Sequence, residues 1–73
     1  MERLLRYSME HERVIRLMLM DEEGNLSQVN ARILRYDADT VDFITTRSPR
    51  TVTVPRKDIL AMDFRKGDDG QVL

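Results

Sequence analysis

The clearest architectural signal in this sequence is the segment Val52-Thr53-Val54-Pro55-Arg56-Lys57-Asp58-Ile59. The alternating valines indicate a strand, and Pro55 ends it because proline has no N–H to donate to a ladder. The three polar residues that follow fit one helical turn, and Ile59 begins a second apolar run. Many small five-stranded barrels close through a strand, a tight polar turn and a restarted strand.

The rest of the chain, followed outward from this segment, predicts one helix and three more strands. Leu5 and Met9 are four residues apart and share a helix face, whereas most later apolar residues alternate with a period of two. The expected helix spans residues 2–12, the expected strands span residues 13–20, 26–36, 40–46, 51–54 and 59–64, and the turns between strands include residues 21–25, 37–39 and 47–50. We expect a mainly β fold, in which a short N-terminal helix precedes a five-stranded antiparallel small barrel. A single domain over residues 1–66 and a flexible tail over residues 67–73 complete the expected organisation.

The same alternation predicts the core. The residues expected to face inward are Ile15, Leu17, Leu19, Val29, Ala31, Ile33, Val41, Phe43, Val52, Val54 and Ile59. Within the long strand 26–36 the apolar parity changes at Ile33, so that Leu34 and Tyr36 continue the inward face. A change of parity indicates a β-bulge or a sharp bend, and a small barrel needs such a bend to close.

The composition limits the classes of protein to which the chain can belong. It has 73 residues and no cysteine, which bounds it to one domain and excludes disulfides and thiolate metal sites. The absence of cysteine also fits a reducing compartment. No apolar run approaches the roughly 18 residues of a membrane helix, and no apolar signal-peptide segment follows Arg3 and Arg6. We therefore expect a cytoplasmic location and no membrane partner.

A chain this short gains stability from interactions beyond its own hydrophobic core. A domain of this length buries only about 60% of the surface that its unfolded chain exposes. Without disulfides or a bound metal, oligomerisation is a natural source of further stability. Self-association is therefore one of the expected modes of action.

No residue pattern indicates catalysis, a metal site or a cofactor. His11 is the only histidine, and its neighbours Glu10 and Glu12 cannot act with it, because adjacent helix residues point in different directions. Asp37 and Asp39 lie in an expected turn, where local hydrogen bonds favour aspartate. We therefore expect that the chain is not an enzyme.

One group of basic residues is a candidate for contacts with nucleic acid. Its members are Arg47, Arg50, Arg56 and Lys57. They lie in the two turns that flank the expected strand 51–54, and arginine suits phosphate recognition through its planar donor group. Ordinary solubilising charge is the competing interpretation.

Two methionines are candidates for a protein interface. Met18 and Met20 face outward if Ile15, Leu17 and Leu19 face the core. Exposed methionines beside an edge strand suit contacts with a partner. The competing interpretation is that the N-terminal helix covers them.

These features together resemble the Sm-like and SH3-like small barrels, and within them most closely the YolD-like proteins and the related WYL domains of bacterial regulators. The resemblance is carried by the segments Asp21–Asn25, Ala31–Asp37 and Val54–Ile59, with Met62. It covers about residues 10–64 and implies an SH3-like or Sm-like antiparallel barrel in a bacterial protein.

The chain departs from these families at three places. Asp42-Phe43-Ile44 stands where WYL domains have Trp-Tyr-Leu, so the ligand role of that run is not carried over. Ala31 stands where Sm-like RNA chaperones have glycine, and Arg56-Lys57 stands where they have a Lys-His pair.

The sequence supports two functional hypotheses. The first is a non-enzymatic binding or regulatory module of the bacterial cytoplasm, which acts through protein contacts or self-association and needs no cofactor. The alternative is an Sm-like nucleic-acid-binding protein that uses the arginine and lysine residues named above. The formal net charge of −1 favours the first hypothesis, because autonomous nucleic-acid binders usually carry a basic excess.

Overall fold

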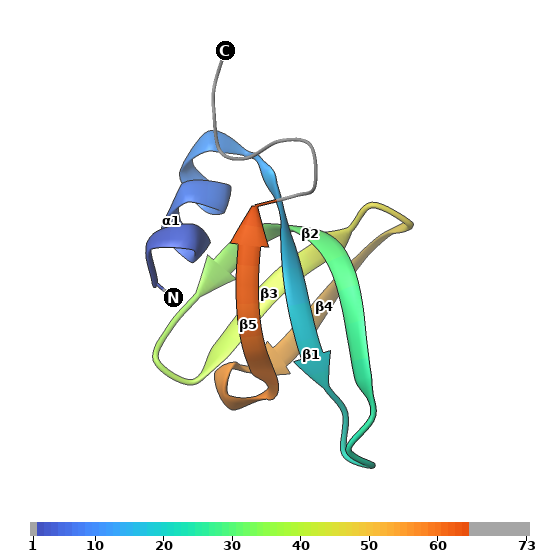
Figure 1. Cartoon of the computed structure of the whole chain (residues 1–73). Coiled ribbons are helices and arrows are strands. Elements are labelled where there is room, and N and C mark those ends of the chain that lie inside the picture. Colours follow the sequence, from blue (N-terminus) through green and yellow to red (C-terminus); the bar gives the residue numbers. More distant parts are fainter. Residues whose placement is uncertain (1, 65–73) are drawn as a thin grey trace.

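The computed structural model describes residues 2–64 of the chain. It contains one N-terminal helix and five antiparallel strands in one sheet (Figure 1), which confirms the mainly β class. The elements are α1 (Glu2–His11), β1 (Val14–Met20), β2 (Leu26–Tyr36), β3 (Thr40–Thr45), β4 (Ser48–Pro55), the 3₁₀ turn η1 (Arg56–Asp58) and β5 (Ile59–Phe64). The expected domain end at residue 66 and the expected tail over residues 67–73 lie outside the described residues.

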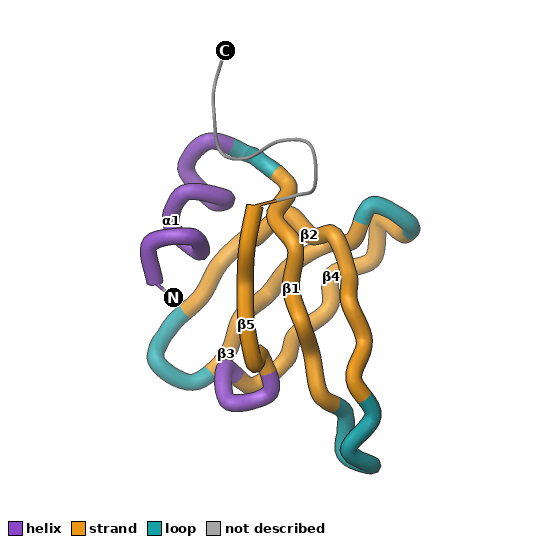
Figure 2. The backbone as a smooth tube through the Cα atoms, in the orientation of Figure 1, coloured by secondary structure: helices purple, strands orange, loops and turns teal. Residues whose placement is uncertain are grey.

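The sheet curves around β2 (Figure 2) but remains open, because its first and last strands are not neighbours. The strand order is β4-β3-β2-β1-β5. β2 pairs with β1 through residues 26–32 and with β3 through residues 31–36, so it belongs to both halves of the sheet. β4 and β5 are the edge strands, and they are not paired with each other in the part of the chain that the structure describes. Closure into a barrel is therefore not confirmed.

The bend expected in β2 is present. The register between β2 and β3 shifts between Ile33 and Arg35, which leaves Leu34 as the extra residue of a β-bulge. Tyr36 then packs against the buried cluster. The prediction that Leu34 also faces the core is wrong, because the extra residue has no partner on β3 and its side chain is exposed.

β4 begins earlier than the sequence predicted. The turn before it consists of Thr46 and Arg47 instead of residues 47–50. The register between β3 and β4 shifts near this turn, so Pro49 lies in an irregular part of an edge strand. Proline is tolerated there because its missing N–H is not needed for a ladder.

The core lies between α1 and the inner face of the curved sheet. Its buried apolar side chains are Leu5, Ile15, Leu17, Ala31, Ile33, Val41, Phe43 and Ile59. Leu19, Val29 and Val54 pack against this cluster and are partly buried. Val52 was also expected in the core, but it is 38% exposed, because β4 has no neighbouring strand on its outer side.

A buried serine fastens α1 to the sheet. The Ser8 Oγ–H donates to the carbonyl of Arg13 at 2.6 Å, and Ser8 Oγ accepts the N–H of Ile33 at 2.9 Å. The last pair of the β1–β2 ladder is Val14 with Arg32, so Arg13 and Ile33 stand where the next pair would form. The Ser8 hydroxyl is inserted between them and satisfies both backbone groups.

The chain leaves α1 through a residue in the left-handed region. Glu12 has a φ of 55°, and the N–H of Arg13 donates to the carbonyl of Ser8 at 3.1 Å. This combination is the Schellman motif that ends many helices. We call the region formed by Leu5, Ser8, Glu12, Arg13 and Ile33 the helix-anchored corner.

Candidate functional site

An apolar patch lies on the outer face of the sheet, opposite the core. Met18 and Met20 face outward because the residues that alternate with them along β1 face the core. Met18 pairs with Ala61 of β5, and Met20 pairs with Leu26 of β2. Directly opposite residues of antiparallel strands share a face. We call this surface the outer patch; it consists of Met18, Met20, Leu26 and Ala61, with Leu60 at its border.

The outer patch is open to solvent. Leu26 is 58% exposed and Met20 is 36% exposed. Leu60 is the extra residue at the register shift between β1 and β5, and it is 47% exposed. α1 packs into the core through Leu5, so the helix does not cover Met20.

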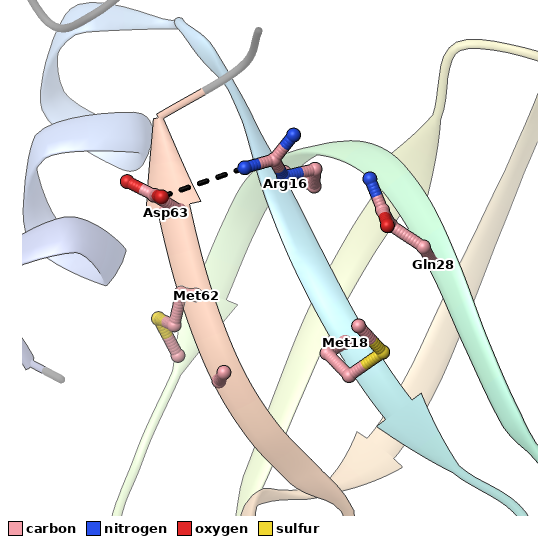
Figure 3. Close-up of a pocket in the computed structure, with 6 residues that line it drawn as sticks. Arg16, Met18, Gln28, Met62 and Asp63 are labelled. Carbon is pink, nitrogen blue, oxygen red and sulfur yellow. Dashed lines mark hydrogen bonds and ion pairs between the residues drawn. The ribbon is translucent and has the colours of Figure 1, made fainter.

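A shallow depression adjoins the patch (Figure 3). Its volume is about 330 Å³, and it is lined by Arg16, Met18, Gln28, Ala61, Met62 and Asp63. At one end, Arg16 Nη2 lies 3.4 Å from Asp63 Oδ2. The Asp63 side chain is 66% exposed, so this ion pair adds little stability, but it gives the depression a polar end.

The turn of the β1–β2 hairpin, beyond the end of β1, carries negative charge. Asp21 Oδ1 accepts the backbone N–H groups of Asn25 and Glu23, each at 2.9 Å. These hydrogen bonds, led by the one from Asn25, hold the pKa of Asp21 below its usual value. Glu22 and Glu23 are exposed beside it. Gly24 takes a φ of 83°, which this turn requires and glycine adopts without strain.

A basic residue lies on the outer face near the start of β1. Arg32 is the cross-strand partner of Val14 at the start of β1 and lies on the outer face with it. Arg32 makes no ion pair with another residue in the range 2–64. Arg16 lies between this end and Met18. Arg16 and Arg32 therefore border the outer patch on the side where β1 begins.

The predicted phosphate-contact residues are not gathered at one site. Arg47 and Arg50 lie where β4 begins, and Arg56 and Lys57 lie in η1, after β4 ends. β4 has eight residues, and a strand of that length spans about 25 Å. The interpretation of these residues as one nucleic-acid surface stays a prediction.

Arg56 is engaged within the chain. Its Nη1 donates to the carbonyl of Asp37 at 2.9 Å, and its Nη2 donates to Glu2 Oε1 at 3.4 Å. The guanidinium carbon lies 6.0 Å from the centroid of the Tyr36 ring. Arg56 thus joins η1 to the β2–β3 turn and to the start of α1, a structural role that the sequence analysis missed.

A polar row across β2, β3 and β4 was also missed. Asp42 Oδ1 accepts the hydroxyl of Thr53 at 2.7 Å, and Asp42 Oδ2 accepts Nη2 of Arg35 at 3.1 Å. The hydrogen bond from Thr53, with that from Arg35, holds the pKa of Asp42 below its usual value. All three residues have outward parity in the sequence, but their alignment depends on the bulge at Leu34.

Comparisons with known proteins give this chain no relative: no protein-family model, no curated protein and no solved structure matches it. The resemblance to YolD-like and WYL-related proteins therefore stays a prediction. Within residues 2–64, no three His, Asp or Glu side chains are grouped so that they could hold a metal ion. No helix in the described part of the chain has both the length and the apolar character needed to cross a membrane.

Proposed function

We propose that this chain is a non-enzymatic binding module of the bacterial cytoplasm that acts through protein contacts at the outer patch. The observation that carries the proposal is contiguous apolar exposure. Met20 and Leu26 are cross-strand partners on the outer face, and they are 36% and 58% exposed. Isolated exposed apolar residues are ordinary on protein surfaces, whereas a contiguous group is a candidate interaction site.

The surroundings of the outer patch suit a protein partner. Protein interfaces combine an apolar centre with a polar rim, and here the Arg16–Asp63 ion pair and the acidic hairpin supply the rim. Methionine adapts its shape to the surface that it contacts. β5, which borders the patch, is an edge strand without proline. No proline in β5 therefore prevents another chain from approaching this edge.

Site-specific photo-crosslinking in cells that make the chain tests the proposal. A benzophenone amino acid replaces Met20 in one variant and Thr51 in the control, because Thr51 is exposed on the outer face of β4. We expect crosslinked protein from position 20 and none from position 51. No product from position 20, or equal products from both positions, contradicts the proposal.

The nucleic-acid alternative has a separate outcome. We expect the solution mass, measured by light scattering, to be unchanged by short mixed RNA or single-stranded DNA. An increase in mass that is lost in the Arg47→Ala/Arg50→Ala variant would favour the alternative, because phosphate contacts dominate affinity for nucleic acid.

A further inference from the structure

We infer that a groove at the hairpin end of the sheet binds a lysine or arginine side chain of a partner protein. The groove lies between the turn of the β1–β2 hairpin and η1, which are at the same end of the sheet (Figure 1). The inference takes from the proposed function only that the partner is a protein. It adds a second contact surface, which adjoins the outer patch at Met20.

The floor of the groove is a part of the core face that the fold leaves uncovered. Leu19 pairs with Ser27, and Val54 pairs with the buried Val41, so these residues lie on the inner face of the sheet. α1 packs onto this face through Leu5, whereas Leu19 and Val54 are only partly buried. The groove has a volume of about 460 Å³, within the range of about 300–1,000 Å³ that is typical of ligand pockets.

Four carboxylates line the same groove. Asp21, Glu22 and Glu23 belong to the turn of the hairpin, and Asp58 belongs to η1. None of the four makes an ion pair with another residue in the range 2–64. Lys57 is adjacent to Asp58 in the sequence but does not line the groove. The negative charge of the groove is therefore uncompensated and favours a positively charged occupant.

An apolar floor beside carboxylates matches a long basic side chain. Lysine and arginine combine an apolar stem with a cationic head, so the stem packs on Leu19 and Val54 while the head contacts the carboxylates. Asp21 Oδ1 already accepts two backbone N–H groups of its own turn, which leaves Glu22 and Asp58 as the expected contacts. A metal ion is a poorer match, because no acidic side chains of the described part of the chain are grouped to hold one.

A partner protein matches the surroundings better than a free amine does. The groove and the outer patch share Met20, so one partner covers both surfaces when its basic side chain enters the groove. Apolar contacts at the outer patch then add to the charge contacts in the groove, as in interfaces that combine an apolar centre with a polar rim.

A synthetic peptide tests the groove directly. The probe is a short blocked peptide of alternating lysine and serine, titrated into the isotopically labelled full chain at low ionic strength while NMR records the amide chemical shifts. We expect saturable shifts at Glu22, Glu23 and Asp58 that weaken as salt is added. Two control peptides replace lysine by glutamate, which reverses the charge, or by diaminopropionic acid, which keeps the charge and shortens the stem. Each is expected to bind about tenfold more weakly or less.

Two variants of the chain locate the binding. Glu22→Gln with Asp58→Asn removes two charges from the groove, and Glu10→Gln with Asp39→Asn removes two charges from exposed positions outside it. We expect the first variant to bind the lysine peptide about tenfold more weakly and the second to bind it like wild type. The amide spectrum of each variant also shows that it is folded.

Four results overturn the inference: no saturable shifts in wild type, unchanged affinity in the first variant, equal binding of the short-stemmed peptide, or binding of spermidine, a free amine, as tight as that of the lysine peptide. The photo-crosslinking experiment separates this failure from failure of the proposed function. Crosslinked protein from position 20 without peptide binding removes the groove and keeps the function. Peptide binding without crosslinked product from position 20 removes the function of the outer patch and keeps the groove.

Discussion

The helix-anchored corner and the β1–β2 hairpin use the same long strand in opposite ways. At the corner, β2 contributes a buried Ile33, and a buried serine of α1 binds its backbone. Toward the hairpin, residues 26–28 of β2 are exposed. The contrast teaches that the corner supplies buried contacts that hold the fold together, whereas the end of β2 near the hairpin presents apolar surface that the fold does not need.

The largest difference in stability is expected between leucine-to-alanine substitutions made in the two regions. Leu5 is fully buried at the corner, and Leu26 is 58% exposed on the hairpin. Leu5→Ala is expected to lower the free energy of unfolding by about 2–5 kcal/mol, whereas Leu26→Ala should change it by about 0.5 kcal/mol or less. Urea unfolding at low protein concentration measures both, and similar losses would remove the contrast between the regions.

The second-largest effect on stability is expected from removal of the Ser8 hydroxyl, which lies between two backbone groups. Ser8→Ala leaves the carbonyl of Arg13 and the N–H of Ile33 without that partner, which costs about 1–3 kcal/mol. Ser27→Ala, on the exposed part of β2, is the control and should be close to neutral. Hydrogen exchange at the Ile33 amide should accelerate in Ser8→Ala alone. If Ser8→Ala is as stable as the control, the two backbone groups pair directly and the serine does not anchor the corner.

Local sequence patterns predicted the strands and the core more completely than they predicted the contacts that hold the fold together. Alternation identified the buried strand residues, and the change of parity located the bulge in β2. Ser8 was missed because a serine on a helix resembles a surface residue, and its burial depends on Ile33, 25 residues away in the sequence. Val52 was placed in the core because alternation does not reveal which strands form the edges of a sheet.

The candidate site was predicted only in part. The outward position of Met18 and Met20 follows from parity alone. Leu60 was missed because the register shift that exposes it depends on the pairing of β5 with β1. Arg56 was grouped with the free basic residues because its acceptors, on Glu2 and Asp37, are distant in the sequence.

A gain in stability is expected at the end of α1. Glu12 holds a φ of 55°, a conformation that is unfavourable for residues with a Cβ and open to glycine. Glu12→Gly is expected to raise the free energy of unfolding by about 1 kcal/mol, because relief of this strain exceeds the added freedom of the unfolded chain. Glu10→Gly, inside the helix, should lower it by about 1 kcal/mol. A lower free energy of unfolding in both variants would show that the backbone at Glu12 is not strained.

The smallest effect is expected at the tip of the hairpin and depends on pH. Hydrogen bonds from Asn25 and Glu23 lower the pKa of Asp21. Its carboxylate therefore adds stability that is present above the unfolded pKa of about 3.9 and is lost as the pH falls through the lower folded value. In urea unfolding at about pH 5 and pH 3, on either side of that pKa, Asp21→Asn should lose less stability on acidification than wild type, whereas Ser27→Ala should respond like wild type. Equal losses of stability in wild type and Asp21→Asn would mean that the charge of Asp21 does not stabilise the hairpin. The acidic residues of the hairpin would then matter only for binding.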